Sequence, residues 1–145
     1  MVFLNLQRRC KTAIIGIALL FLTACTTTPQ GKSLDRSNYA DLASTAVALT
    51  VNSNAYEANP LGYALIPLKL SMGWAVERVY EDCHNRADFV GMANTVFYGL
   101  SVNNLAVAAG AVLPWSLLIG GAVGYWYYWH GYHLEPDDVW NCEDL

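Results

Sequence analysis

Basic residues are scarce in this sequence, which holds eight Lys and Arg against twelve Asp and Glu and has a formal charge of −4. Three of the cations, Arg8, Arg9 and Lys11, lie near the N-terminus, so the chain from residue 25 onward keeps five cations against twelve acids, a formal charge of −7. Proteins that bind phosphate backbones present clustered Lys and Arg side chains. We therefore expect no nucleic-acid partner.

Several sequence patterns are missing as well. The chain has no internal repeat and no strict alternation of apolar and polar residues, which a half-buried strand would show. No nucleophile and base occur at a recognisable spacing. These absences favour an all-α protein without enzymatic activity and make an enzyme the less favoured alternative.

The N-terminal segment has the features of an export signal. Arg8, Arg9 and Lys11 form a positive region, an apolar run follows over 13–22, and small residues come next. Such a run is too short for a comfortable transmembrane helix. We therefore interpret residues 1–24 as a signal peptide.

The site after this run reads Leu22-Thr23-Ala24-Cys25 and resembles the lipobox of bacterial lipoproteins. The resemblance implies that the chain is cut just before Cys25 and that acyl chains such as palmitate on this cysteine anchor the protein. It also implies a cell-envelope location facing the periplasm, with the choice of inner or outer membrane open. Residues 25–36 would form a lipidated polar tether. The alternative is an ordinary secretory signal with a chance cysteine.

Two cysteines remain once Cys10 leaves with the signal peptide and Cys25 is acylated. An exported chain meets an oxidising compartment, so Cys83 and Cys142 are candidates for one disulfide. Two unpaired thiols are the alternative.

The remaining chain, roughly 120 residues, is long enough for one domain. Its apolar residues form four blocks, at 37–54, 59–80, 88–110 and from 114 into an aromatic stretch, and we interpret each block as a helix. Short connections make sequential helices antiparallel. The sequence thus predicts an all-α fold, a small antiparallel four-helix bundle over 37–134, followed by an acidic tail over 135–145.

Two of the four blocks favour insertion into a membrane. The third and fourth are long and almost uncharged, and Gly120 and Gly124 would allow close helix contact. The first two blocks carry charges that include Asp41 and Lys69, which argues against four plain spans. We expect a bundle that is at least partly membrane-embedded. A peripheral lipoprotein that touches the membrane only by its aromatic end is the alternative.

Polar side chains recur on single faces of the predicted helices. Asp41 and Thr45 share a face of the first helix, and Lys69 is the natural partner for Asp41 or Glu57. Such side chains are costly in an apolar bundle unless they pair with one another. They either form interhelical hydrogen bonds that fix the packing or line a functional centre inside a membrane. The buried polar candidates are Asp41, Thr45, Glu57, Asn59, Lys69 and Asn94.

The same part of the chain carries a second resemblance. Asp41-x-x-x-Thr45, then Glu57-x-Asn59-Pro60, then Lys69 follow one another ahead of a third helix that bears Asn residues. Over about 39–110 this order is similar to an uncharacterised family of small bacterial multi-helix membrane proteins. The resemblance implies a membrane-embedded helical fold and no particular activity.

Aromatic rings are concentrated over 124–133. They follow the apolar run 117–123 and precede an acidic segment, an order typical of a helix that emerges from lipid. An aromatic patch on a soluble bundle, either core or partner-binding, is the alternative. The expected interfacial residues are Tyr125, Trp126, Tyr127, Tyr128, Trp129 and Tyr132.

Two histidines in the aromatic stretch could suggest a metal site. His130 and His133 lie three residues apart and Glu135 follows, with His84 as a further candidate. A zinc site needs three or four ligands in suitable geometry, and this spacing is weak support for one. We expect no metal and no cofactor.

Together these patterns predict a lipid-anchored bacterial envelope protein with a structural or interaction role in a membrane assembly. Its expected partners are membrane lipid and other envelope proteins. The alternative is a small membrane enzyme or transport component with Asp41, Glu57, Lys69 and Asn94 in a buried polar centre.

Overall fold

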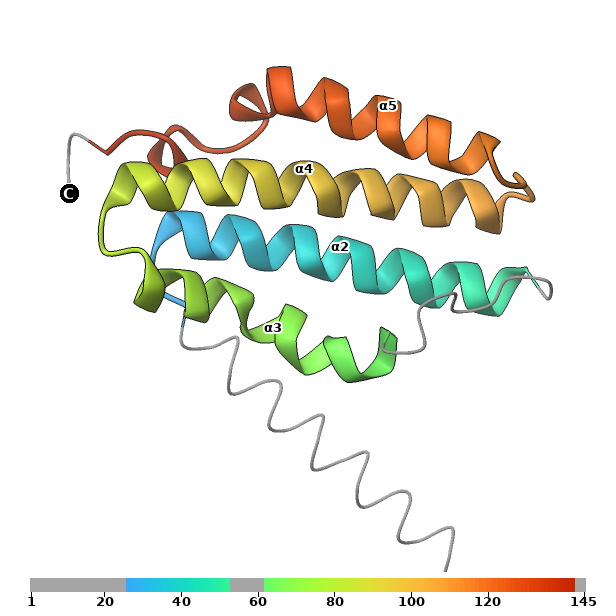
Figure 1. Cartoon of the computed structure of the whole chain (residues 1–145), viewed down its shortest axis with the longest axis horizontal. Helices are drawn as coiled ribbons and strands as arrows, with labels where there is room; N and C mark the ends of the chain where they lie inside the picture. Colours follow the sequence, from blue (N-terminus) through green and yellow to red (C-terminus); the bar gives the residue numbers. More distant parts are fainter. Residues whose placement is uncertain (1–25, 53–61, 143–145) are drawn as a thin grey trace, which may run out of the picture.

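The computed structural model describes residues 26–52 and 62–142, and within these ranges the fold is entirely helical, with four α-helices and no strand. The predicted all-α class and the number of helices are therefore confirmed. Figure 1 shows the four helices side by side. They are α2 (Pro29–Val51), α3 (Gly62–Val79), α4 (Cys83–Ala108) and α5 (Trp115–His130), followed by the short 3-10 helices η1 (Gly131–His133) and η2 (Asp137–Val139).

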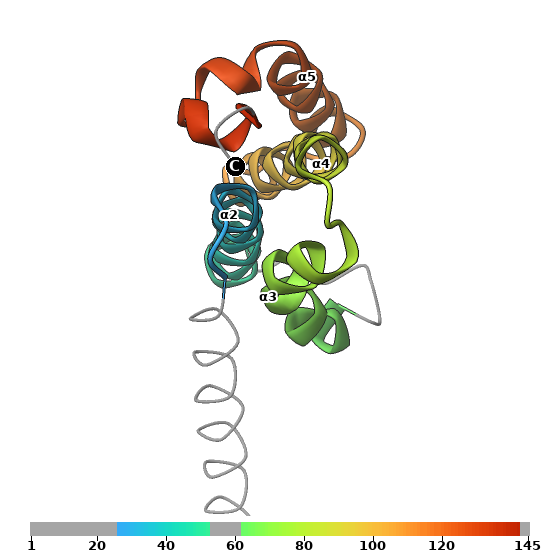
Figure 2. The same ribbon diagram turned by 90° about the vertical axis from the view of Figure 1, so that its left-hand side faces the viewer.

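The helices form a row in the order α3, α2, α4, α5. The α2 helix packs against α4 and α3, and α5 packs on α4. Sequential helices are antiparallel, as the short connections predicted, so α2 and α4 run in the same direction at the centre of the row (Figure 1). In Figure 2, α3 and α5 lie on opposite sides of the central pair. The arrangement leaves one long side of α5 uncovered by the other helices.

The α2 helix begins eight residues before the predicted start at Ser37, which corrects the expected polar tether over 25–36. Thr28 is the N-cap, its hydroxyl accepts a hydrogen bond from the Gly31 amide at 3.1 Å, and Pro29 occupies the first helical turn. Threonine followed by proline is a strong start signal. The first turns are then held by packing, because Leu34 is fully buried. Local composition suggested a tether, and burial against α3 and α4 overrides it.

The α4 helix also starts earlier than the predicted Asp88. Asp82 is its N-cap, and the carboxylate accepts a hydrogen bond from the Asn85 amide at 2.9 Å. An Asp at this position satisfies an amide that has no partner within the helix. The segment 83–86, which lies between the second and third predicted helices, is therefore the first turn of α4.

The hydrophobic core is small and joins α2, α3 and α4. Leu34, Val76, Val90 and Phe97 form its buried centre. Around this centre the rings of Tyr80 and Phe89 stack, with centroids 5.2 Å apart. The core lies nearer the end of the row where α2 and α4 begin. Elsewhere the central pair is joined by polar side chains.

The α4 and α5 helices approach each other through glycines. A Cβ atom at Gly124 would lie 3.0 Å from the Thr95 carbonyl oxygen, and one at Gly99 would lie 3.0 Å from the Gly120 carbonyl oxygen. The backbones are therefore in direct contact, as the spacing of Gly120 and Gly124 suggested. Gly99 is their counterpart on α4, and the sequence had not singled it out.

The predicted disulfide between Cys83 and Cys142 is confirmed, with 5.7 Å between the two Cα atoms. It ties the C-terminal segment to the first turn of α4. The same segment is held against α2, because the Gln30 side-chain amide donates to the Val139 carbonyl at 2.9 Å. Val139 itself is 1% exposed. The last residues described are thus part of the folded unit.

Across the described ranges, no helix combines the length and the apolarity that crossing a membrane requires. The expected membrane embedding has no support from these helices and stays a prediction.

Candidate functional site

The interface between α2 and α4 is a polar seam. Along α2, the residues that face α4 recur every three or four positions, as a single helix face requires. Nearly all of them are polar, and several are at most 2% exposed. From α4, Asn94 and Ser101 enter the same interface. The fully buried polar residues of α2 are Gln30, Ser33, Ser37, Asn38 and Asp41.

One end of the seam holds an ion pair. The Lys69 ammonium lies 2.5 Å from Asp41 Oδ2, and the Asp41 side chain is 2% exposed against 24% for Lys69. The Asn104 amide donates to Asp41 Oδ1 at 3.2 Å and to the Thr45 hydroxyl at 2.9 Å. The Lys69 ammonium also lies 5.7 Å from the centroid of the Phe97 ring. Three predicted candidates, Asp41, Thr45 and Lys69, are therefore brought together.

Asn94 belongs to a second cluster nearer the other end of the seam. Its amide donates to the Ser33 hydroxyl at 2.7 Å, and its Oδ1 accepts from the Ser37 hydroxyl at 2.5 Å. The predicted polar candidates are thus divided between two clusters and do not form a single centre. Glu57 and Asn59 lie outside the described residues.

The second cluster continues to a buried glutamate at the start of the predicted acidic tail. The Glu135 side chain is 5% exposed and lies 3.5 Å from the Arg36 guanidinium. Tyr127 donates its hydroxyl to Glu135 Oε1 at 3.1 Å, and Tyr98 contacts the same oxygen at 3.5 Å. The tail therefore starts inside the fold. Its acidic composition gave no sign of this, because the partners come from α2, α4 and α5.

Both tyrosines in this cluster resist ionisation. Burial, together with the negative charge of Glu135, raises the pKa of Tyr98 to about 12. The same two causes raise the pKa of Tyr127 further above its usual value. Both hydroxyls therefore keep their protons and donate hydrogen bonds to the carboxylate at any physiological pH.

Tyr127 also corrects the predicted set of interfacial aromatics, because it is 5% exposed and faces α4. It continues the buried face of α5 that Ser116, Gly120 and Gly124 begin. This spacing of four, four and three residues was readable from the sequence as one helix face. The side chain of Tyr132 lies outside the described part. The four remaining rings are exposed: Tyr125, Trp126, Tyr128 and Trp129.

The outward side of α4 and α5 is apolar. No Lys, Arg, Asp or Glu occurs between Asp88 and Glu135. A groove of about 310 Å³ between the two helices is lined by apolar residues of both, which shows that their exposed stripes are continuous. We call this surface the α4–α5 apolar face. Its members are Met92, Val96, Leu100, Leu117, Tyr125, Tyr128 and Trp129.

A further carboxylate holds the segment next to the expected lipidation site. Glu77 Oε1 accepts hydrogen bonds from the Thr27 amide at 2.8 Å, the Thr28 amide at 2.6 Å and the Thr28 hydroxyl at 2.8 Å. These amides precede the first turn of α2, where negative charge is favourable. Glu77 was not among the predicted site residues. Cys25 lies just outside the described residues.

Asp35 is buried close to this contact and packs against Gly73 of α3. Removal from water raises the pKa of Asp35, and the nearby charge of Glu77 adds to the increase. The ionised form of Asp35 is therefore unfavourable in the folded protein.

His130 of the aromatic stretch has local partners. The His130 ring stacks on Trp126, with centroids 5.3 Å apart, and its Nδ1 lies 3.1 Å from the Trp126 carbonyl oxygen. Glu135 is turned inward toward the tyrosines. Within residues 26–52 and 62–142, no three His, Cys, Asp or Glu side chains are grouped so that they could hold a metal ion.

Comparison with known proteins found no matching family model, no matching curated protein and no matching solved structure.

Proposed function

We propose that this chain is a lipid-anchored bacterial envelope protein with a structural or interaction role in a membrane assembly. The observation that carries the proposal is the α4–α5 apolar face. Monomeric soluble proteins rarely expose large contiguous apolar patches, and those that do use them to bind a partner or a membrane. Leu118 and Trp115 of α5 extend the exposed apolar surface beyond this face, at 60% and 64% exposure.

The distribution of side chains supports contact with an apolar environment. The buried seam of α2 and α4 is polar, and the most exposed helix, α5, is apolar and without charged residues. Water favours the opposite distribution, because exposed apolar area costs about 25 cal/mol per Å². Lipid chains or an apolar partner helix on α5 would remove this cost. Exposed Trp and Tyr rings are suited to the level of the lipid headgroups.

The proposed lipid anchor agrees with the start of α2. If Cys25 is acylated, only Thr26, Thr27 and Thr28 separate it from the helix, which begins at Pro29. Three extended residues span about 10 Å. Because Glu77 holds Thr27 and Thr28, the domain would lie directly against the membrane surface, without a long tether.

Metabolic labelling with palmitate tests the anchor. The wild-type protein expressed in a bacterium should incorporate label, and Cys25→Ser should abolish it. Cys10→Ser is the matched control and should leave labelling unchanged, because the signal peptide is removed. Label that persists in Cys25→Ser would contradict the proposal.

Quenching of Trp fluorescence by lipids brominated near the headgroup tests the apolar face. Vesicles should quench the wild-type protein, and Leu100→Lys with Leu117→Lys should reduce quenching strongly, because two charges would enter the groove between α4 and α5. Val79→Lys is the control, since Val79 is 71% exposed at the end of α3. Equal quenching of all three proteins would count against a role for this face.

The alternative, a small membrane enzyme or transport component, has weaker support. Asp41 uses both carboxylate oxygens, one toward Lys69 and one toward Asn104. Asn94 belongs to the other cluster. These contacts are those of interhelical pairs that fix packing. Separate Ala substitutions distinguish the two roles, because a packing role predicts lower stability, whereas a functional centre predicts lost activity in a protein of unchanged stability.

A further inference from the structure

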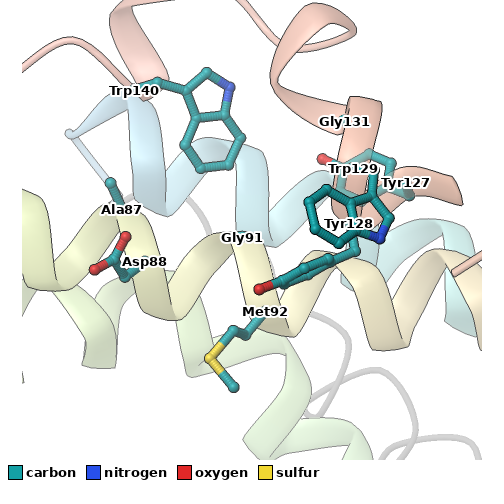
Figure 3. A pocket seen from close by; sticks show the side chains of 9 residues that line it. All are labelled: Ala87, Asp88, Gly91, Met92, Tyr127, Tyr128, Trp129, Gly131 and Trp140. Atoms are coloured by element: carbon teal, nitrogen blue, oxygen red, sulfur yellow. The ribbon is translucent and has the colours of Figure 1, made fainter. Parts of the chain in front are cut away.

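A pocket of about 650 Å³ lies between α4, α5 and the C-terminal segment. Figure 3 shows Gly91 and Met92 of α4 at its base, with Trp140 on one side and Tyr128 and Trp129 on the other. Its volume lies within the range of small-molecule sites, about 300–1,000 Å³. The pocket shares Met92, Tyr128 and Trp129 with the α4–α5 apolar face and adds Asp88 and Trp140 to them.

The Trp140 side of the pocket is held in place. Its ring packs over Gly91, and a Cβ atom at that glycine would already touch it, at 3.4 Å from the nearest ring carbon. On either side of Trp140 in sequence, Val139 is buried and Cys142 is bonded to Cys83. The opposite side belongs to α5, whose approach to α4 is set by the glycine contact. The Trp140 wall is therefore preorganised, which lowers the entropy lost when a ligand binds.

Charge at the pocket is negative. Asp88 is the one charged side chain among the lining residues, and Asp137 lines an adjoining hollow that also includes Trp140. No Lys or Arg lines the pocket or the adjoining hollow. Faces of Trp and Tyr attract cations through the ring quadrupole, by about 0.5–2 kcal/mol for each contact. Aromatic walls beside a carboxylate therefore suit a ligand that carries positive charge on an organic body.

We propose that this pocket binds an organic ammonium ion. The ammonium lies beside Asp88 and the aromatic rings, and the apolar part of the ligand covers Met92 and Trp140. A free amine and the amine headgroup of a lipid share this chemistry. The proposal does not depend on lipid anchoring, because every residue that it uses belongs to the folded part of the chain.

Isothermal titration calorimetry on the purified full-length chain tests the charge preference. The probe is hexyltrimethylammonium, compared with 1-hexanol and hexyl sulfate, which have the same alkyl chain without charge and with negative charge. We expect the cation to bind with a Kd about tenfold or more below that of either comparison ligand, as cation–π contacts and Asp88 would produce. Equal affinities for the three ligands would overturn the proposal.

Two pairs of variants locate the site. Asp88→Asn and Trp129→Leu should each weaken binding of the cation by about tenfold. Glu81→Gln and Trp115→Leu are their controls, because both side chains are exposed and lie outside the pocket lining. Circular dichroism must be the same for all four variants. If the first pair binds as tightly as the controls, the pocket is not the binding site and the proposal fails.

Competition experiments then identify the source of the ammonium. Displacement of hexyltrimethylammonium by choline or ethanolamine in solution, and not by vesicles, supports a free organic ammonium ion as the ligand. Displacement by phosphatidylethanolamine vesicles and not by phosphatidylglycerol vesicles supports a lipid headgroup. If neither kind of competitor displaces the probe, its binding depends on the alkyl chain more than on the ammonium group, and the proposal is overturned.

Discussion

Asp41 shows how single side chains keep the polar seam stable. Its carboxylate is 2% exposed, yet one oxygen contacts the Lys69 ammonium and the other accepts from the Asn104 amide. Buried polar groups are costly when a partner is missing, and nearly neutral when each is satisfied. The seam therefore determines which residues of α2, α3 and α4 face one another more than it adds net stability.

Lys69→Met should destabilise the protein by about 3 kcal/mol, because it leaves the Asp41 carboxylate buried without its cation. The double variant Lys69→Met with Asp41→Asn should recover much of this loss. Urea denaturation followed by circular dichroism measures both. Lys32→Met, an exposed position on α2, is the control and should be close to wild type. If Lys69→Met is as stable as Lys32→Met, the ion pair contributes little to the stability of the protein.

Asp35 makes stability depend on pH. Its pKa is higher in the folded protein than in the unfolded chain, so the ionised form opposes folding, and the penalty disappears as pH falls through the folded pKa. Asp35→Asn should therefore increase the free energy of unfolding at pH 7, and the increase should shrink as pH approaches the unfolded pKa near 3.8. Urea denaturation at several pH values measures it. A gain in the free energy of unfolding that does not change with pH would contradict a raised pKa of Asp35.

At the scale of elements, α5 is held by close backbone contact and has few polar links to α4. The glycines at positions 120 and 124 face Gly99 and Thr95, whereas Gly121 has no neighbouring atom within 4 Å of where its Cβ would lie. A side chain at position 120 would therefore collide with α4, whereas a side chain at position 121 has room. The buried side of α5 requires small residues, and its outward side is free to contact lipid or a partner.

Gly120→Ala and Gly121→Ala form a matched pair. Each adds one methyl group to the interior of α5 and gains about 1 kcal/mol of helix propensity. At Gly120 the new Cβ would lie 2.5 Å from the Gly99 carbonyl oxygen, so the helices must separate. We expect Gly120→Ala to lower the thermal unfolding midpoint and Gly121→Ala to raise it slightly. Equal shifts of the unfolding midpoint for the two variants would show that α4 and α5 are not in tight contact at Gly120.

At the scale of the whole molecule, the C-terminal segment joins elements that are distant in sequence. Glu135 contacts Tyr127 of α5 and Arg36 of α2, the Val139 carbonyl accepts from Gln30, and Cys142 is bonded to α4. These contacts hold α2, α4 and α5 in one unit. They also position Trp140 over α4, where it forms one side of the proposed ammonium site.

Removing the disulfide with Cys83→Ser and Cys142→Ser should cost about 4 kcal/mol in the chain-entropy model, because the two residues are 59 positions apart. Urea denaturation of this variant and of the reduced wild-type protein should give the same loss. The segment that carries Trp140 should also become accessible to protease. A reduced protein as stable as the oxidised one would show that the noncovalent contacts suffice.

Several features were predictable because they depend on neighbouring residues or on simple chemistry. Four separate apolar blocks predicted four helices, and two thiols in an exported chain predicted one disulfide. Helix starts were less accurate at Ser37 and Asp88. Tertiary burial extended α2 toward its N-terminus, and the Asp82 cap begins α4 ahead of Asp88. The anchor at Cys25, the membrane role and the candidates Glu57 and Asn59 stay predictions.

The sequence by itself determined the helical class, the disulfide partners and the uncharged character of the chain between Asp88 and Glu135, since each follows from residue identity and short-range pattern. Only the tertiary structure decided that Tyr127 and Glu135 are buried together, that Asn94 and Asp41 belong to separate clusters, and that Trp140 faces α5. These relations depend on how four helices pack. Packing is set by long-range contacts that no local pattern encodes.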